Sequence, residues 1–158
     1  MAKKAAPARA GSGARVSIRR AAESDLPAIV ALDATTGEPK PDYWRDLFAQ
    51  FSDAQANKRV FLVAEFAGKV VGFITGEIRA FEFGAERCGW IFAISVDPEM
   101  RMHNVGTRLF EAICAIFSGA GVDKVRTLVD RDVDLMLAFF RSQGMIFGHY
   151  IQMEMSLG

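Results

Sequence analysis

An alternation of apolar and polar residues between Arg59 and Phe81 constrains the fold of this chain more than any other stretch. The run RVFLVAEFAGKVVGFITGEIRAF is rich in β-branched and aromatic residues, and a short Ala67-Gly68-Lys69 segment divides it. Such a pattern predicts two antiparallel strands joined by a tight turn. In the second strand, the odd-numbered residues from Val71 to Arg79 are predicted to share one face, and the even-numbered residues to share the other.

Helical and strand-like periods follow one another along the rest of the chain. We expect helices at 22–37, 41–55, after the turn near 104, and at 132–144, with Ser24 and Asp132 as N-caps and Gly144 just past the last helix. Further strands are expected at 16–19, 88–97, 124–130 and 146–155. The run at 88–97 is apolar on both faces, which predicts an interior strand. The resulting order, β-α-α-β-β-β-α-β-α-β, predicts a single α/β (α+β) domain with a mixed sheet flanked by helices.

Charge is unevenly distributed, although the formal net charge of the 158 residues is zero. Residues 1–20 contain six basic side chains and no acidic one, so we expect 1–15 to be a flexible basic tail and 16–158 to be the folded domain. Residues 21–158 then hold thirteen basic and nineteen acidic side chains, a net charge of about −6. This balance argues against nucleic-acid binding and suits a cationic acceptor such as an amine, although acidic surfaces also serve solubility.

The cysteines and histidines are too few and too scattered to form a metal site. Cys88 and Cys114 lie within apolar runs without the spacing of metal ligands, which predicts buried free thiols and a reducing compartment. His103 and His149 are the only histidines, so no metal is expected. No apolar run approaches the roughly 20 residues of a membrane helix, and we expect a cytoplasmic protein without membrane contact.

The turn after Val96 has the composition of an anion site. In VDPEMRMHNVGTRLFEAICAIF, a strand ends at Asp97-Pro98, and an arginine, a histidine, an asparagine and a glycine precede an amphipathic helix. The first amides of a helix and the positive end of its dipole attract anions. The amides from Met102 to Thr107 are candidate donors, and Arg101 and His103 would add side-chain donors. A plain capped loop explains the turn equally well when it is taken alone.

The chain from about Val16 to Leu157 resembles the GNAT superfamily of N-acetyltransferases. Arg101-Met102-His103-Asn104-Val105-Gly106 is similar to that family's Arg/Gln-x-x-Gly-x-Gly/Ala loop, and FFRSQGM at 139–145 is similar to its Tyr-x-x-x-Gly-Phe ending of the last helix. The resemblance implies a mixed, mostly antiparallel sheet with about four flanking helices. It also implies coenzyme A as the anion, with its pyrophosphate on the amides of Met102, His103, Asn104, Val105, Gly106 and Thr107. The pantetheine arm would pair with the backbone of Ile94, Ser95 and Val96, and Phe140 and Arg141 would lie near the coenzyme.

Two positions depart from the family's pattern. Asn104 replaces the first loop glycine, and we expect the loop to keep its geometry because Asn tolerates a positive φ and serves as an N-cap. Phe140 replaces the tyrosine that many members use as a proton donor to the leaving thiolate. Because Phe140 cannot donate a proton, the acid of this chain must lie elsewhere or be dispensable.

Acetyl transfer to an amine with a pKa of ~10.4 needs a base, a polarised carbonyl and a stabilised thiolate. Glu77 is the best candidate base, although it is equally well explained as a salt-bridged strand residue paired with Arg79. Tyr43 is a candidate acid or acceptor contact, although simple packing explains it too. The N–H of Val96 or a neighbour is the candidate donor to the carbonyl. Asp130 is a further carboxylate that would face the acceptor.

The sequence therefore predicts an acetyltransferase that moves an acetyl group from acetyl-CoA to a primary amine, on a small molecule or a protein, by direct attack in a ternary complex. The alternative is a non-catalytic module that binds acyl-CoA as a sensor or interaction partner, favoured by Phe140 and by the absence of an acidic residue from 88–96. The exposed edge of the final strand would also suit a homodimer.

Overall fold

The computed structural model describes residues 15–51, 58–80, 84 and 86–158. The predicted basic tail therefore lies almost wholly outside the described residues. The chain separates into two compact units, of which the first ends at Thr127 and the second begins at Leu128. Within the described residues, the first unit contains five strands and three α-helices, and the second contains one α-helix.

A five-stranded sheet forms the centre of the first unit. Its strands lie in the order of the sequence, β1 to β5, and neighbours pair antiparallel except for β4 and β5, which are parallel. This arrangement confirms the predicted mixed, mostly antiparallel sheet and the interior place of the strand at 88–97. The strands are β1 (Ser17–Arg20), β2 (Arg59–Phe66), β3 (Lys69–Arg79), β4 (Cys88–Val96) and β5 (Val125–Thr127).

The predicted hairpin between β2 and β3 is confirmed. Phe66 pairs with Lys69, which leaves Ala67 and Gly68 as a two-residue turn. Both residues have positive φ, 49° at Ala67 and 78° at Gly68, as in a type I′ turn. Gly68 adopts this backbone without cost, and the twist of such a turn matches the twist of the two strands.

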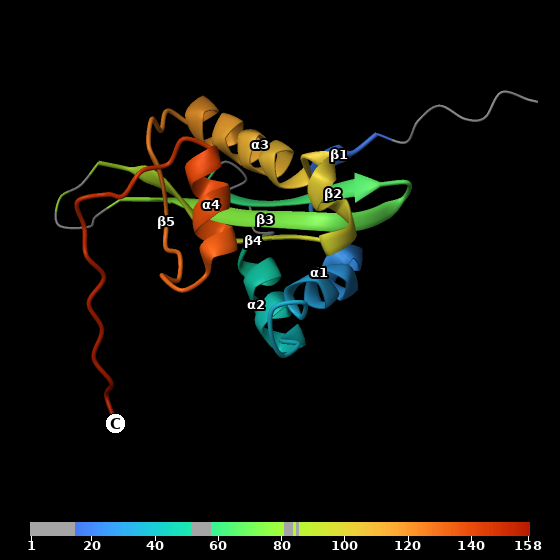
Figure 1. Cartoon of the computed structure of the whole chain (residues 1–158), viewed down its shortest axis with the longest axis horizontal. Helices are drawn as coiled ribbons and strands as arrows, with labels where there is room; N and C mark the ends of the chain where they lie inside the picture. Colours follow the sequence, from blue (N-terminus) through green and yellow to red (C-terminus); the bar gives the residue numbers. More distant parts are fainter. Residues whose placement is uncertain (1–14, 52–57, 81–83, 85) are drawn as a thin grey trace, which may run out of the picture. The chain divides into compact units, whose positions relative to one another are not determined.

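Helices α1 (Leu26–Asp33) and α2 (Pro41–Phe51) cover one face of the sheet (Figure 1). Trp44 is buried between them and the strands, with its ring centre 4.9 Å from that of Phe73 on β3. Its indole Nε1 donates to Asp33 Oδ2 at 2.9 Å, so the buried polar atom is satisfied. The core on this face consists of Ile29, Leu32, Trp44, Phe51, Phe61, Val63 and Phe73.

Helix α3 (Val105–Gly119) covers the opposite face (Figure 1). Its buried stripe includes Leu109, Ile113 and Phe117, as the helical period predicts. The helix comes close to the strands because Gly89 on β4 has no side chain. A Cβ built at Gly89 would collide with the Phe117 ring.

The first helix is shorter than predicted, and Ser24 is not its N-cap. Residues Glu23–Asp25 form a 3₁₀ turn, and α1 begins at Leu26 with Asp25 in the cap position. The reason is an ion pair that the period of apolar residues does not reveal. Arg19 on β1 donates to both carboxylate oxygens of Asp25, which also accepts from the Ala22 N–H at 2.8 Å.

The second unit contains α4 (Asp134–Ser142), which starts two residues later than predicted. Asp132 is not its N-cap, because Val133 holds that position and the Asp132 N–H donates to Asp130 Oδ1 at 2.9 Å instead. Asp130 is thus used in a local turn. Gly144 follows the end of α4 with a φ of 87°, which confirms the predicted glycine stop.

The predicted final strand at 146–155 is wrong. The described residues after Gly144 form neither strand nor helix. Most of the large apolar side chains there are almost fully exposed, at 88% for Ile151, 91% for Met153, 80% for Met155 and 91% for Leu157. These side chains recur at every second position, so an extended chain would carry them on one face.

Two further predictions concern the thiols and membranes. Cys88 is buried, as predicted, whereas Cys114 is only half-buried, and neither forms a disulfide within the described residues. None of the helices in the described ranges has the length and apolar character to cross a membrane.

Candidate functional site

The C-terminal half of β4 forms no hydrogen-bonded pairs with β5, the strand next to it. β5 pairs in parallel only with Gly89, Trp90 and Ile91, and Thr127 Oγ1 adds a bond to the Ile91 carbonyl at 3.0 Å. At the point where this pairing ends, the β3–β4 register shifts, so that Phe92 is the extra residue of a bulge. Within the described residues, β4 beyond the bulge is therefore paired on its β3 side alone.

Alternation along β4 shows which groups face outward. The Asp97 N–H donates to the Val71 carbonyl at 2.9 Å, and Ser95 lies opposite Phe73 in the next such pair. Since hydrogen-bonded and non-hydrogen-bonded pairs alternate in antiparallel strands, Ile94 and Val96 turn their N–H and C=O groups away from β3. The backbone of Ser95 faces β3 instead, and its Oγ donates to the Leu32 carbonyl at 3.1 Å.

The turn after β4 has the left-handed residue that the sequence led us to expect. Residues Pro98–His103 form a 3₁₀ helix, which Asp97 caps by accepting from the Glu99 N–H at 2.9 Å. Asn104 then has φ 55° and ψ 24°, in the αL region, and α3 begins at Val105. This confirms that asparagine keeps the left-handed backbone at the position where the family's loop has its first glycine. The Asn104 side chain makes no cap hydrogen bond, so it contributes its backbone conformation alone.

The start of α3 presents amides and positive charge at one place. Its internal hydrogen bonding begins with Arg108, whose N–H donates to the Asn104 carbonyl at 3.0 Å, so the amides of Val105 and Gly106 point out of the helix end. The Val105 side chain is fully buried and anchors this turn. Exposed side chains of Arg101, Met102, His103 and Arg108 surround it, and Thr107 lies in the same first turn.

A second group of polar side chains crosses the other end of the sheet. Arg59 on β2 is in register with Glu77 on β3, Glu77 with Trp90 on β4, and Trp90 with Arg126 on β5. Register partners in a sheet carry their side chains on the same face. We call these four residues, with Arg79 two positions beyond Glu77, the polar row.

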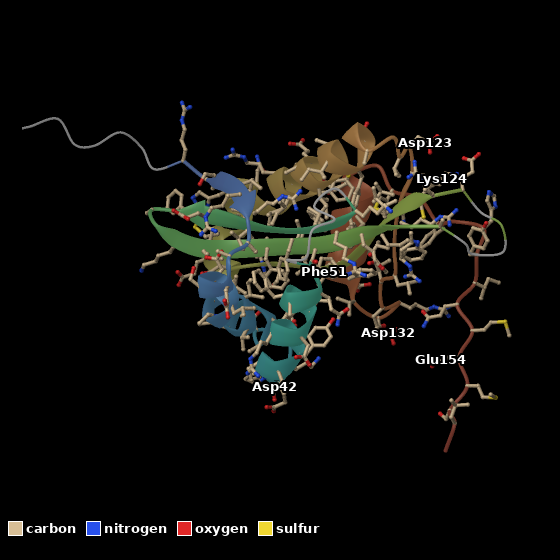
Figure 2. All side chains as sticks on the ribbon, turned by 180° about the vertical axis from the view of Figure 1, so that it is seen from behind. Asp42, Phe51, Asp123, Lys124, Asp132 and Glu154 are labelled. Atoms are coloured by element: carbon tan, nitrogen blue, oxygen red, sulfur yellow. The ribbon has the colours of Figure 1, made fainter. Side chains whose placement is uncertain are left out.

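The contacts of helix α2 show which face of the sheet carries the polar row. The Phe51 ring lies 6.3 Å from the Phe92 ring, and the Arg59 guanidinium lies 5.9 Å from the Phe51 centroid. Figure 2 shows Phe51 at the end of α2 that meets the sheet, with Asp42 at the outer end. The row is therefore on the α1/α2 face, next to the bulge in β4.

Glu77, the predicted base, has two arginine neighbours. Its Oε2 lies 3.5 Å from Arg59 Nε and its Oε1 lies 3.9 Å from Arg79 Nε, and a quarter of the side-chain surface is exposed. Arg59 also donates to the Gln50 carbonyl of α2 at 2.8 Å. The structure thus supports the pairing with Arg79 that the sequence left open, and adds Arg59, which sequence reasoning missed.

Trp90 provides a buried donor inside the polar row. Its indole Nε1 is shielded from solvent and has no hydrogen-bond partner within the described residues. The Arg79 guanidinium lies 5.2 Å from the Trp90 ring centre. Nη1 of Arg126 is likewise shielded from solvent. Only the strand register brings Arg59, Trp90 and Arg126 together, so their separate positions in the sequence gave no signal.

Three other predicted residues belong to other elements, α2 and α4. Tyr43 is exposed near the outer end of α2, where its ring packs edge-on against Trp44 at 5.1 Å. Phe140 and Arg141 belong to α4 in the second unit. The Phe140 ring packs against Phe139 at 5.2 Å, and the Arg141 guanidinium lies 5.8 Å from the Phe147 ring centre. The described residues include no group of three or more His, Cys, Asp or Glu side chains placed to hold a metal ion.

Comparison with known proteins gives a consistent result. A model described as the acetyltransferase (GNAT) family matches residues 22–145. The chain is similar in structure to aminoglycoside N-acetyltransferase AAC(6')-Iy in complex with CoA, at 15% identity and a TM-score of 0.81, over 94% of this chain and 99% of that one.

Two further structures extend the comparison. One is an aminoglycoside 6'-N-acetyltransferase from Acinetobacter haemolyticus, at 17% identity, a TM-score of 0.77, and coverage of 89% of this chain and 97% of that one. The other is a transcriptional regulator from Bacillus halodurans C-125, at 16% identity, a TM-score of 0.76, and coverage of 90% and 100%. At these identities the likeness concerns the fold. No curated protein matches the chain in sequence.

Proposed function

Because the chain belongs to the acetyltransferase (GNAT) family, we propose that it transfers an acetyl group from acetyl-CoA to a primary amine by direct attack in a ternary complex. One observation carries the proposal: the outward backbone groups of Ile94 and Val96 run directly into the αL turn at Asn104 and the positively charged start of α3. An extended ligand that ends in a diphosphate fits this arrangement. The extended part of the ligand would form hydrogen bonds with the backbone of β4, and its diphosphate would lie against the start of α3.

The proposed roles follow the direction of β4. The diphosphate binds the amides of Val105 and Gly106 with the aid of Arg101 and His103, and the pantetheine arm pairs with Val96 and Ile94. The acyl end then lies near the bulge at Phe92, where β5 pairing resumes. The N–H of Ile94, which is the outward-facing amide nearer to the bulge, is the proposed donor to the acyl carbonyl, and the N–H of Val96 is the alternative donor. Phe140 and Arg141 of the second unit are proposed as further coenzyme contacts.

The chemistry balances with one base. The amine nitrogen loses a proton and attacks the acyl carbon, the carbon–sulfur bond breaks, and the thiolate takes up a proton. Glu77 lies opposite Trp90, two residues or about 7 Å along β4 from Phe92, so we propose that it accepts the first proton through water. Tyr43 is the proposed acid or acceptor contact.

Two measurements test the proposal. A thermal shift with acetyl-CoA reports binding, since a ligand at 100-fold over its Kd adds about 2.7 kcal/mol to stability. Release of coenzyme A over a panel of amines reports catalysis. Binding without release for any amine would favour the non-catalytic acyl-CoA module, and absence of both would remove the function.

Variants test the individual roles in the same assays. Gly106→Asp places a carboxylate at the start of α3 and should abolish coenzyme binding by charge repulsion. The control is Ala115→Glu, which adds the same charge at an exposed position in the middle of α3 and should leave binding unchanged. Glu77→Gln should lower kcat most at pH values below the pKa of the amine. An unchanged pH–rate profile would exclude Glu77 as the base.

We also propose that the chain forms a homodimer through the segment 150–157. Ile151, Met153, Met155 and Leu157 would form one apolar face of an extended strand, and they are exposed in the single chain. Burial of side chains of this size contributes about 1.5–3 kcal/mol each. Packing of this segment against another apolar surface is therefore strongly favoured. The same segment of a second copy is a suitable cover, because antiparallel pairing about Met153 brings both apolar faces to the same side of a two-fold interface.

A further inference from the structure

The Arg59 side chain joins the last turn of helix α2 to the middle of the sheet. Arg59 is the first residue of β2 and is in register with Glu77 on β3. Its Nη1 donates to the Gln50 carbonyl at 2.8 Å, its Nε lies 3.5 Å from Glu77 Oε2, and its guanidinium carbon lies 5.9 Å from the centre of the Phe51 ring. One side chain of β2 therefore contacts both the end of α2 and the proposed base.

The shape of a guanidinium group makes these contacts depend on one another. The group is planar and its N–H donors form a fixed fork, so the direction of one donor determines the direction of the others. The Gln50 carbonyl holds Nη1 of Arg59 at hydrogen-bonding distance, and Nε of the same group then lies beside the Glu77 carboxylate. The end of α2 thus determines where the positive charge of Arg59 meets Glu77.

The contact with Gln50 also gives Arg59 a structural role. The last four carbonyl groups of an α-helix have no partner inside the helix, and Gln50 is one residue before the end of α2 at Phe51. An arginine at a helix C-terminus also interacts favourably with the helix dipole. Capping of α2 explains the contact with Gln50 but not the contact with Glu77, so experiments can separate the two roles.

Glu77 stays accessible while Arg59 holds it. The 3.5 Å between Arg59 Nε and Glu77 Oε2 is longer than the roughly 2.7–3.2 Å of a hydrogen bond, so this contact is an ion pair. A carboxylate has about four acceptor sites, and a quarter of the Glu77 side-chain surface is exposed. A water molecule can therefore reach the carboxylate and carry a proton to it.

The same turn of α2 contacts the strand that carries the proposed acyl site. Phe51 lies at the end of α2 that meets the sheet (Figure 2), and its ring is 6.3 Å from that of Phe92, edge-on at 76°. Phe92 is the extra residue of the β4 bulge. Because Gln50 and Phe51 are neighbours in the helix, one helical turn contacts both the bulge and the arginine that holds Glu77.

We propose that Arg59 is a positioning residue for acetyl transfer: anchored on the Gln50 carbonyl, it holds the Glu77 carboxylate in the orientation that accepts the amine proton through water. This inference rests on the proposed function and adds a residue to it. A glutamate side chain has several staggered rotamers, and the ion pair with Arg59 selects among them. Catalytic groups must be held within about 0.5 Å of their productive position, so a base without its partner is a poor base.

Steady-state kinetics with an amine that releases coenzyme A test this role. Arg59→Met removes the charge and the donors, and should lower kcat at least about tenfold while changing KM for both substrates less than about twofold. Arg59→Lys keeps the charge and should recover part of the loss. Arg45→Met is the control, since Arg45 pairs with Asp42 on the exposed side of α2, and it should leave kcat unchanged. An unchanged kcat in Arg59→Met would overturn the proposal.

A double variant separates positioning of the base from capping of α2. If Arg59 acts through Glu77, Arg59→Met combined with Glu77→Gln should have a kcat within about twofold of that of Glu77→Gln alone. If Arg59 only caps the helix, the two losses are independent and multiply, which would overturn the proposal. Full activity of Glu77→Gln would overturn both the base and this role. Arg59→Gln keeps an N–H donor for the Gln50 carbonyl and replaces Arg59→Met if that variant does not fold.

Unfolding measurements separate this inference from the acetyltransferase function. The free energies of unfolding of the unsubstituted protein, the two single variants and the double variant give the coupling between Arg59 and Glu77 without any substrate. We expect a favourable coupling at low salt that decreases at high salt, because both side chains are partly exposed. If no amine releases coenzyme A, the acetyltransferase function fails, and the coupling still shows whether Arg59 holds Glu77. Absence of coupling at low salt would overturn the positioning role.

Discussion

Arg19 and Asp25 form a two-point ion pair that holds the first strand to the first helix. Arg19 Nη1 lies 2.7 Å from Asp25 Oδ2 and Nη2 lies 2.9 Å from Oδ1, and Asp25 is nearly buried. The third nitrogen, Nε, donates to Glu65 on β2 at 3.0 Å. One guanidinium therefore ties together β1, β2 and the turn that starts α1.

We predict that Asp25→Asn lowers the free energy of unfolding by about 1.5–3 kcal/mol at neutral pH, because hydrogen bonds to charged groups are worth this much. Urea unfolding measures it. Asp42→Asn is the control, since Asp42 is exposed and pairs with Arg45 across one turn of α2. That variant should change stability by less than about 0.5 kcal/mol.

The same pair predicts a pH dependence with a definite sign. The hydrogen bonds from Arg19 lower the pKa of Asp25 below its usual value. The folded state therefore holds fewer protons than the unfolded state near pH ~4, so the stabilisation is complete above about pH 4 and is lost as the pH falls through the lowered pKa. Acid unfolding of Asp25→Asn should be less steep than that of the unsubstituted protein. Identical acid profiles for the two would contradict this role.

Asn104 allows a matched test of the turn before α3. Asn104→Gly keeps the left-handed backbone and should change the Kd for coenzyme A by less than about threefold. Asn104→Val forces a β-branched residue into φ 55°, where non-glycine residues pay about 1–2 kcal/mol, and should weaken binding at least tenfold. Calorimetry with coenzyme A measures both variants, and unfolding of the ligand-free proteins shows how much of the loss is general. Equal affinities in the two variants would show that the αL turn does not shape the site.

We predict that one methyl group added at Gly89 has a strong effect on the stability of the fold. Gly89→Ala should destabilise the fold by about 1–3 kcal/mol, because its Cβ meets the ring of the fully buried Phe117. Gly119→Ala is the control, since nothing lies within 4 Å of a Cβ at that helical position. It should be neutral or stabilise by up to about 1 kcal/mol. Thermal unfolding measures both, and a destabilised Gly119→Ala would show that the contrast does not come from the contact with Phe117.

Local patterns predicted the sheet and its hairpin because each depends on residues close in sequence. The alternation in β2 and β3 and the Ala67-Gly68 turn indicate the same hairpin, and the αL residue before α3 follows from the chemistry of Asn. The start of α1 was not predicted because Asp25 is fixed by an ion pair with Arg19, six residues earlier on β1, which the period of apolar residues does not reveal. The polar row was missed for a similar reason. Register alone places Arg59 and Arg126 beside Glu77 and Trp90, and single residues on four strands have no shared spacing.

The strand predicted at 146–155 shows a different limit. The alternation of Ile151, Met153 and Met155 is a property of the chain, but a strand also needs a partner that supplies hydrogen bonds. Periodicity identifies a segment that is able to pair and does not identify the partner. The described segment has the pattern without the pairing.

We predict that the thiol of Cys114 reacts slowly with alkylating agents. Burial raises the pKa of its thiol to about 11, so about one thiol in a thousand is ionised at pH 8. Iodoacetamide at pH 8 should modify it slowly in the native protein and rapidly in urea, as mass spectrometry can show. The raised pKa also means that stability falls above pH ~9, where the unfolded thiol ionises first. Cys114→Ala should remove that part of the alkaline loss, and equal labelling rates in the native and unfolded protein would contradict the shift.

The segment at 150–157 leads to a prediction about the oligomeric state. If its apolar face is covered by a second copy, light scattering should give twice the mass of the 17.3 kDa chain. Met153→Lys places a charge at the centre of the apolar face and should produce monomers, because an unpaired buried charge is far more costly than the contact it replaces. Gln152→Lys adds the same charge to the opposite face of an extended strand and should remain dimeric. A monomeric unsubstituted protein, or equal masses for the two variants, would exclude pairing through this segment.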